Sequence, residues 1–495
     1  MEVTQRDPRR WLILVVLCLS TLVLVIDNMV LTVAIPPLAA DLGADAQEIQ
    51  WILDSYILVF AGLLLTAGSL SDRFGRRKVM IIGLALFGVA SLAATYATSP
   101  ELLIAARAAM GVGGALIMPS TLSILITVFD EEERRKAMAA WSAVAMLGLI
   151  GGPVLGGVLI AWFWWGAVFL INVPIAVLAI IAALILMPES TGPQTRPDPL
   201  GAVLSAVGMI ALVWTIIELP HGLSVPALAV AVLALAAFVV WELRTPYPMV
   251  PLGLFRNRTF SGASFSLTLV QIGNGGLLLV LTQYLQYVLG YTPTQAGLAF
   301  IPMALASLLC NGLGATLGAK IGNRPMIATG LVVMAAGFGL LASLSTGSGL
   351  VMTAVALFVL GAGGGLAMPA AIAALMGTVP PEHAGVGSAL NDTIQQAGAA
   401  LGIAVLGSIL SSGYTGAIPA TAPAAARRSI GDALALGDAT IARTARDAFT
   451  AAMSDAFVIS AAGVLAAAVL ALLVIRDRRN DTAQTPSEPV PAGNH

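Results

Sequence analysis

The sequence predicts an all-α polytopic membrane protein, and three observations support that fold class. Hydrophobic residues make up 58% of the 495 positions and charged residues only 10%, whereas soluble proteins have about 25% charged residues. The apolar residues form about fourteen runs, each of membrane-spanning length. Short motifs from the first half of the chain also recur in the second half. The formal net charge of -2 gives no indication of a nucleic-acid partner.

Spanning helices are expected where about 17 to 25 apolar residues run between charges, glycines or prolines. Six come first, at about residues 11–35, 50–70, 79–97, 101–126, 137–161 and 166–187. Two follow a proline-rich connector, at about residues 200–219 and 225–242. A second connector precedes the last six, at about residues 260–288, 296–318, 326–345, 350–376, 386–411 and 455–475.

The predicted domains are two six-helix bundles with a helix pair inserted between them. The N-terminal bundle covers residues 1–187, the connector with its two inserted helices covers 188–258, and the C-terminal bundle covers 259–476. The C-terminal bundle includes a long loop, 412–454, whose composition suits a disordered tether as well as a folded cap. The polar, proline-containing residues 477–495 are expected to form a disordered tail.

The distribution of Lys and Arg predicts that both termini are cytoplasmic, because basic residues concentrate in the cytoplasmic loops of membrane proteins. With that orientation, most of the 24 basic residues fall on the cytoplasmic side, and loop 412–454 points outward. Arg107 is an exception within an apolar run, and long outward loops escape the charge rule. The first run has no small-residue cleavage site, so we expect it to remain as a helix that directs the chain to the cell membrane.

An internal repeat relates the two halves of the chain. The segment Gly113–Pro119 recurs as Gly363–Pro369, and Arg73–Arg77 has a weaker counterpart in Lys320–Arg324. Two related six-helix halves are a layout used by transporters that alternate access to a site near the middle of the membrane. The sequence therefore favours a transporter that works by rocking of two bundles.

A short, densely charged loop lies between two long apolar runs, from Gly68 to Lys78. A simple interpretation is cytoplasmic positive charge. The spacing favours a further role, because Gly68 and Gly75 permit close helix approach and a tight turn. Asp72 can also accept from the amides of a helix N-terminus or pair with a basic residue across the interface. We therefore predict a conformational latch between the halves. Its residues are Gly68, Asp72, Arg73, Gly75, Arg76 and Arg77.

Four charged residues lie within predicted spans, namely Asp27, Asp54, Arg107 and Asp392. Each costs about 2.5–3.5 kcal/mol at a helix centre on insertion scales, so such residues usually serve a function. One alternative is a structural ion pair, for example between Asp27 and Arg107. Otherwise, burial favours the neutral form of a carboxyl group, which then takes up and releases protons near neutral pH. A proton and a cationic substrate compete for such a carboxylate, which is the minimum requirement for exchange.

Glycines spaced by four residues mark the fifth predicted span. Gly148, Gly152 and Gly156 fall on one helix face, next to Pro153 and Gly157. The simpler interpretation is close helix packing through small residues, with a kink at Pro153. The alternative is that this smooth face is the surface on which the two halves slide.

Several activities are disfavoured because their motifs are missing. None of the three lysines, Lys78, Lys136 and Lys320, follows a glycine, so the phosphate-binding loop of nucleotide-powered pumps is absent. Cys18 and Cys310 fall in apolar runs without metal-ligand spacing, and no Gly-x-Ser-x-Gly motif is present. We therefore expect no metal and no cofactor, with the proton as coupling ion. A membrane receptor and a membrane enzyme are weaker alternatives.

The loop 68–78 resembles the signature between helices 2 and 3 of the major facilitator superfamily. Leu103–Gly113 resembles the helix 4 motif of that superfamily, and Gly148–Gly157 resembles the helix 5 signature of its antiporters. With Ile26–Asn28 and Trp51–Tyr56, these blocks resemble the fourteen-helix drug:proton antiporters of the QacA type. The resemblance implies the major facilitator fold and a monomeric, proton-coupled exporter of lipophilic, cationic drugs or antiseptics. A dedicated exporter of one metabolite or antibiotic is the alternative.

The resemblance also implies roles for single residues. Asp27 and Asp54 stand where such exporters carry acids in helices 1 and 2, and Asp392 matches an acid in helix 13. Asn311 and Gln396 stand where some relatives carry further acids. The resemblance therefore disfavours strongly dicationic substrates.

A substrate pocket is expected to combine aromatic walls with polar groups. Aromatic rings attract lipophilic cations, although Trp and Tyr more commonly anchor helices at the membrane interface. Asn274 stands at the repeat position of Asp27, as its neutral counterpart. The candidate pocket residues are Trp51, Tyr56, Trp141, Asn274, Tyr284, Tyr287, Asn311, Gln395 and Gln396.

Overall fold

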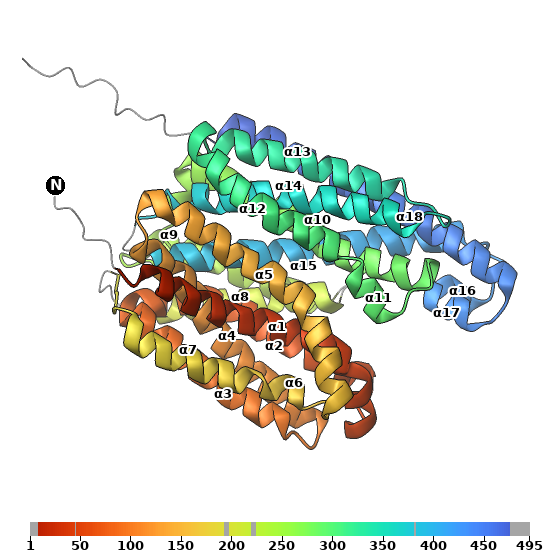
Figure 1. Cartoon of the computed structure of the whole chain (residues 1–495), viewed down its shortest axis with the longest axis horizontal. Helices are drawn as coiled ribbons and strands as arrows, with labels where there is room; N and C mark the ends of the chain where they lie inside the picture. Colours follow the sequence, from red (N-terminus) through yellow and green to blue (C-terminus); the bar gives the residue numbers. More distant parts are fainter. Residues whose placement is uncertain (1–7, 45, 193–197, 219–223, 381–382, 476–495) are drawn as a thin grey trace, which may run out of the picture.

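The protein is a bundle of long helices packed side by side (Figure 1). The residues that its computed structural model describes are 8–44, 46–192, 198–218, 224–380 and 383–475. Within these ranges the chain forms helices, turns and short connections and no β-strand. The all-α prediction is therefore confirmed for the described part of the chain. The predicted tail 477–495 lies outside it.

The first half folds into six long helices and one short helix. They are α1 (Arg10–Leu42), α2 (Ala46–Phe74), α3 (Arg76–Thr95), α4 (Pro100–Val128), α5 (Glu131–Trp162), α6 (Ala167–Leu170) and α7 (Asn172–Leu186). Polar side chains determine where two of them begin. Ser99 accepts from the N–H of Leu102 at the start of α4, and Asp130 accepts from the N–H of Glu133 at the start of α5.

The second half repeats this arrangement with additional short helices. Its elements are the 3₁₀-helix η2 (Leu252–Arg256), α10 (Arg258–Gln283), the π-helix η3 (Tyr284–Val288), α11 (Pro293–Leu298), α12 (Ile301–Ile321), α13 (Asn323–Ala342), α14 (Leu350–Met376), α15 (Ala384–Ala417), α16 (Ala424–Arg428), α17 (Ile430–Ala435) and α18 (Ala439–Val474). Within the half, α10 packs on α15, and α14 packs on both α12 and α13.

The packing of the two halves confirms the internal repeat. In the first half, α1 packs on α5, and α4 packs on both α2 and α3, as their counterparts do in the second half. The halves meet through two equivalent contacts, α2 with α15 and α12 with α5. The turns α2–α3 and α12–α13 both contain a glycine with positive φ, 109° at Gly75 and 99° at Gly322. We call the end of the molecule where Gly75 lies the latch end.

The inserted helices are α8 (Pro199–Glu218) and α9 (Val225–Arg244). The helix α8 packs on α2 and, less extensively, on α15, so that it covers the seam between the two halves. The main neighbour of α9 is α8, and the apolar side chains along α9 are largely exposed, as expected for a helix that faces lipid. In contrast to these exposed apolar side chains, the acidic side chain of Glu242, near the end of α9, is buried.

Among the described residues, 13 helical segments are long and apolar enough to cross a membrane. The remaining predicted span, 137–161, lies within α5, a 32-residue helix that packs along α1. Every predicted span thus coincides with a helix. The predicted boundaries were less accurate than the spans themselves, since α1 continues beyond residue 35 to Leu42.

Residues 412–454 are mainly helical. The ends of α15 and α18 extend into this segment, and α16 and α17 lie between them, at the right-hand end of the molecule in Figure 1. The Tyr414 hydroxyl donates to the carbonyl oxygen of Ala426 at 2.8 Å and so ties α16 to α15. Of the two alternatives that the sequence left open, the structure shows the folded cap.

Candidate functional site

One ion pair lies buried inside the N-terminal half. Arg107 Nη1 on α4 donates to Asp27 Oδ2 on α1 at 2.5 Å, and each side chain is only 1% exposed. Arg107 Nε also donates to the carbonyl oxygen of Ile52 on α2, at 3.2 Å. Two of the four predicted intramembrane charges, Asp27 and Arg107, therefore neutralise each other. This is the structural ion pair that the sequence left open as an alternative.

Two further side chains complete the surroundings of this pair. Asn172 on α7 donates from Nδ2 to Asp27 Oδ1 at 2.7 Å and to Ser91 Oγ on α3 at 3.2 Å. The ring of Tyr56 lies under the Arg107 guanidinium, 4.5 Å from Cζ to the ring centroid, which is a cation–π contact. Asn172 was missed in the sequence, where its only signal is a single amide within an apolar run. Five helices meet at the pair.

The third predicted acid, Asp392, lies on α15 in the other half. It is 4% exposed, and its Oδ1 accepts from the side-chain amide of Asn391 at 3.0 Å. Its Oδ2 has no hydrogen-bond partner within the described ranges, and neither have the hydroxyls of Ser388 and Thr393. This stretch of α15 therefore holds buried polar atoms with unused hydrogen-bonding capacity. The fourth charged residue, Asp54, lies half-buried on α2.

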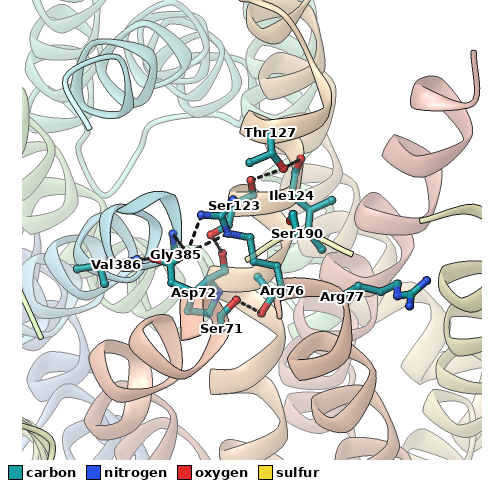
Figure 2. Close-up of polar contacts among 12 residues, drawn as sticks. Ser71, Asp72, Arg76, Arg77, Ser123, Ile124, Thr127, Ser190, Gly385 and Val386 are labelled. Carbon is teal, nitrogen blue, oxygen red and sulfur yellow. Dashed lines mark hydrogen bonds and ion pairs between the residues drawn. The ribbon is translucent and has the colours of Figure 1, made fainter. Parts of the chain in front are cut away.

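The predicted latch forms around the carboxylate of Asp72, at the end of α2 (Figure 2). Asp72 Oδ1 accepts from the backbone N–H of Gly385 at 2.8 Å, and Oδ2 accepts from the N–H of Val386 at 3.0 Å. Oδ1 also accepts from Arg76 Nε and Nη2, at 2.9 and 2.7 Å. Gly385 and Val386 lie in the first turn of α15, so a residue of the first half caps a helix of the second half.

Close backbone contact accompanies this cap. A β-carbon added at Gly68 would lie 2.7 Å from the carbonyl oxygen of Gly385, and one added at Gly385 would lie 2.7 Å from the carbonyl oxygen of Gly68. Any larger residue at either position would force α2 and α15 apart. Gly68 was predicted from the sequence, whereas its partner was not.

The second half does not supply an equivalent cap to α5 of the first half. His383, at the N-cap position of α15, makes no capping hydrogen bond, and among the described residues Asp72 accepts from the N–H groups of Gly385 and Val386 instead. The repeat counterpart of α15 is α5, which has its own cap in Asp130. The position equivalent to Asp72 is Ala319, as the weaker repeat Lys320–Arg324 already implied. The latch is therefore a one-sided device.

The connector after α7 reinforces the latch. Glu189 accepts from the backbone N–H of Arg77 at 3.1 Å and of Lys78 at 3.2 Å, and so caps the start of α3. The Arg77 side chain donates in return to the carbonyl oxygen of Met187 at 2.8 Å. The N–H of Gly192 donates to the carbonyl oxygen of Asp72 at 2.6 Å. The role of Glu189 was missed because nothing local to residues 187–192 indicates which helix they contact.

The glycine ladder of α5 packs against α1. A β-carbon at Gly148 would lie 2.9 Å from Cβ of Val25, and one at Gly156 would lie 3.1 Å from the carbonyl oxygen of Val30. Gly152 meets Met29 in the same way. This face therefore lies inside the N-terminal half, and the sliding surface expected as the alternative is not formed by it. Four-residue spacing indicates a flat face but not the helix that covers it.

The ladder's neighbour Gly157 has open space around its α-carbon. Pro153 lies within α5, and its side chain is outside the described part of the structure.

The aromatic pocket candidates are dispersed. Trp51 pairs with Trp214 of α8, with ring centroids 4.8 Å apart, and Trp141 donates to the hydroxyl of Thr21 at 2.9 Å. Tyr284 is buried and donates to the carbonyl oxygen of Ser345 at 2.8 Å. These contacts hold neighbouring segments of the chain together.

The remaining candidates lie on four elements of the second half. Tyr287 is 38% exposed in η3, and Asn274 of α10 donates within its own helix to Gln271 at 3.4 Å. Asn311 is buried on α12. Gln395 and Gln396 are half-buried on α15, one turn beyond the polar cluster of Asp392.

Two pseudo-symmetric helical bundles, joined by a latch at one end and holding buried charges, have the layout of a membrane transporter. The family model of the Major Facilitator Superfamily matches residues 17–265 and 263–493, and the chain belongs to that superfamily. The human organic anion transporter MFSD10 has a similar fold, with a TM-score of 0.62 at 15% identity over 92% of this chain and 100% of that one.

Two curated relatives match across most of their length. The chain is 37% identical over 494 residues to the multidrug efflux pump LfrA of Mycolicibacterium smegmatis, covering 96% of this chain and 98% of LfrA. It is 36% identical over 432 residues to the puromycin resistance protein pur8 of Streptomyces alboniger, covering 85% of this chain and 86% of pur8. The resemblance noted from the sequence motifs is thereby confirmed at the level of the family.

Proposed function

We propose that this protein is a proton-coupled antiporter that exports lipophilic cations by alternating access. The observation that carries the proposal is the carboxyl group of Asp392, which is buried with one oxygen unpartnered among the described residues. An isolated carboxylate is costly to bury, so such a group holds a proton or a cation. Competition between the two for one carboxyl group is the basis of exchange.

Asp27 and Arg107 supply the coupling in this proposal. Protonation of Asp27 removes the charge that attracts the guanidinium and leaves Arg107 with the Ile52 carbonyl and the Tyr56 ring as its remaining contacts. Because the pair joins α1 to α4 and touches α2, gain of a proton alters packing in the helix that carries Asp72. Proton binding and the latch thereby act on the same element.

The proposed orientation places the latch end in the cytoplasm of a multi-pass cell-membrane protein, since most basic residues belong to the loops and tails expected on that side. One proton that enters across 100 mV supplies about 2.3 kcal/mol. One pH unit adds about 1.4 kcal/mol. Exchange of one proton for one monovalent cation moves no net charge, so it runs on the pH difference alone. A second proton would be needed to use the voltage.

Similarity to the multidrug efflux pump LfrA supports export as the direction and a broad range of substrates. The dispersed aromatic candidates agree with recognition by a wide cavity in another conformation more than with one tight pocket. We propose that the protein works as a monomer, because each half already covers the other.

The test is ethidium transport by the full-length chain in proteoliposomes under an imposed pH gradient. Asp392→Asn is expected to lose ethidium binding and transport, because an amide carries no charge for the cation. Asp27→Asn is expected to retain binding and lose the dependence on the gradient. Asp447→Asn, an exposed acid on α18, serves as the matched control.

Proton release gives a second readout that is independent of transport. Ethidium added to weakly buffered, detergent-solubilised protein is expected to release protons from wild type and from Asp447→Asn, but not from Asp392→Asn. Unchanged transport in both Asp27→Asn and Asp392→Asn would remove the carboxylate mechanism. Transport by wild type without any proton dependence would favour a uniporter.

The second candidate is a dedicated exporter of one antibiotic or metabolite. It is favoured by pur8, a relative that is named for resistance to a single antibiotic. Competition against ethidium by chemically unrelated lipophilic cations distinguishes the two functions. A broad exporter is inhibited by most of them at similar concentrations, whereas a dedicated exporter responds to one compound class.

A further inference from the structure

Two carboxyl groups meet at one end of the inserted helix pair, away from the charges considered so far. Asp198 directly precedes α8, and Glu242 lies in the last turn of α9. A β-carbon added at Gly201 would lie 2.7 Å from Glu242 Oε1 and still closer to Asp198 Oδ2. The two oxygens therefore converge on the same small space. Glu242 is 4% exposed and Asp198 is half-buried, so water screens the pair only weakly.

The hydrogen bonds around the pair assign a different role to each acid. Asp198 accepts three, from the N–H of Gly201 at 2.8 Å and from Trp241 Nε1 at 2.8 Å to Oδ1 and 3.0 Å to Oδ2. Glu242 Oε2 accepts from the N–H of Val250 at 3.0 Å. Glu242 Oε1 has no partner among the described residues and faces Asp198. Asp198 thus has the environment of a carboxylate, and Glu242 Oε1 is placed as a donor.

Within the described part of the chain, no basic group forms an ion pair with either acid. Along α8 the one other titratable residue is Glu218, at the far end of the helix. On α9 itself Arg244 is exposed, and in the following segment Tyr247 is exposed. Two carboxylates this close do not both remain ionised.

We propose that Asp198 and Glu242 form a proton-binding site in which Glu242 Oε1 carries the proton and donates it to Asp198 Oδ2. The proton joins the start of α8, the end of α9 and, through Val250, the segment that leads into the second half. Its loss leaves two facing carboxylates that repel one another and loosens this junction. Because α8 packs on α2 and α15, the junction supports the seam where the latch lies.

This site is independent of the proposed export function, and its test requires no transport. The full chain in lipid nanodiscs is unfolded thermally at a series of values from about pH 6 to about pH 9. The folded state holds the proton more tightly than the unfolded chain, so stability is present at the acidic end and is lost as pH rises. Wild-type Tm is expected to fall over this range by at least about 2 °C more than that of Glu242→Gln.

The two amide variants separate the shared proton from ordinary packing. In Glu242→Gln the amide N–H replaces the O–H donor to Asp198 permanently, so the pH dependence disappears while the acidic-pH Tm is retained. Asp198→Asn leaves Glu242 intact and supplies an N–H donor to it, so it also flattens the profile and remains informative if the first variant folds poorly. Glu218→Gln is the matched control and is expected to follow wild type.

Two results would overturn the proposal. One is a parallel pH profile for wild type, Glu242→Gln and Asp198→Asn, which would mean that no proton is shared. The other is saturable stabilisation of wild type by Mg²⁺ or Ca²⁺ at alkaline pH that is absent in Glu242→Gln, which would mean that the two carboxylates hold a metal ion instead.

Discussion

Replacing Asp72 by Asn tests whether the latch sets the balance between conformations. Asp72 pairs with Arg76 within the first half, so this contact is expected to remain when the halves separate. Only the two bonds from the N–H groups of Gly385 and Val386 cross the interface. An Asn retains one acceptor oxygen and presents an N–H₂ group to the other amide, so one of the two crossing bonds is lost.

The magnitude follows from the charge and the burial of that bond. The Asp72 side chain is 8% exposed, and a hydrogen bond to a charged group contributes about 1.5–3 kcal/mol. Taking about 2 kcal/mol, the variant shifts the equilibrium away from the closed latch by about 30-fold. The rate of switching changes with it, whereas ligand affinity is expected to change less, because Asp392 and Asp27 lie elsewhere.

The assay is a distance measurement between spin labels at Lys136→Cys on α5 and Lys320→Cys on α12, both exposed, with Cys18 and Cys310 replaced by Ser. Asp72→Asn is expected to lengthen the distance by opening the latch end. Ser71→Ala is the matched control, since Ser71 contacts Ser120 within the same half at 3.0 Å. An unchanged distance in Asp72→Asn, or an equal change in Ser71→Ala, would refute the reasoning.

Two further predictions concern the contacts that surround the latch. Gly385→Ala places a β-carbon 2.7 Å from the carbonyl oxygen of Gly68, so the same label pair is expected to report an open latch end, and a wild-type distance would contradict it. Glu189→Ala removes the cap of α3, which is worth about 0.5–2 kcal/mol. In this variant the first-turn amides of α3, those of Arg77 and Lys78, are therefore expected to exchange with deuterium at least about threefold faster than in wild type. Unchanged exchange at these two amides would count against the cap.

The latch illustrates how far motif reasoning reaches. The loop 68–78 was identified from its charge density and its glycines. Asp72 was expected to accept from the amides of a helix N-terminus or to pair with a basic residue across the interface. The structure shows the contact with helix amides across the interface, at Gly385 and Val386. The basic partner of Asp72 is Arg76 of the same half, not a residue across the interface. The sequence did not identify Gly385 as the partner, because backbone amides carry no residue-specific signal and these two positions are 313 residues apart.

The buried charges also show that a sequence identifies a functional residue more readily than its partner. A charge within an apolar run is visible in one sequence, because its cost in hydrocarbon is a property of the residue itself. Its partner is not visible in this way. Asp27 and Arg107 were foreseen as one alternative, whereas the contribution of Asn172 depended on α7 folding back beside α1.

The sequence by itself determined the spans, the two related halves, the position of the charged loop and the acids inside the membrane. Each of these follows from local composition and from the energy of placing side chains in lipid. Only the tertiary structure decided that the glycines of α5 face α1, that residues 412–454 fold as a helical cap, and that Glu189 strengthens the latch. It also placed Glu242, in the last turn of α9, beside Asp198, which directly precedes α8. Such contacts depend on how whole helices pack, and helical periodicity defines a face without naming its neighbour.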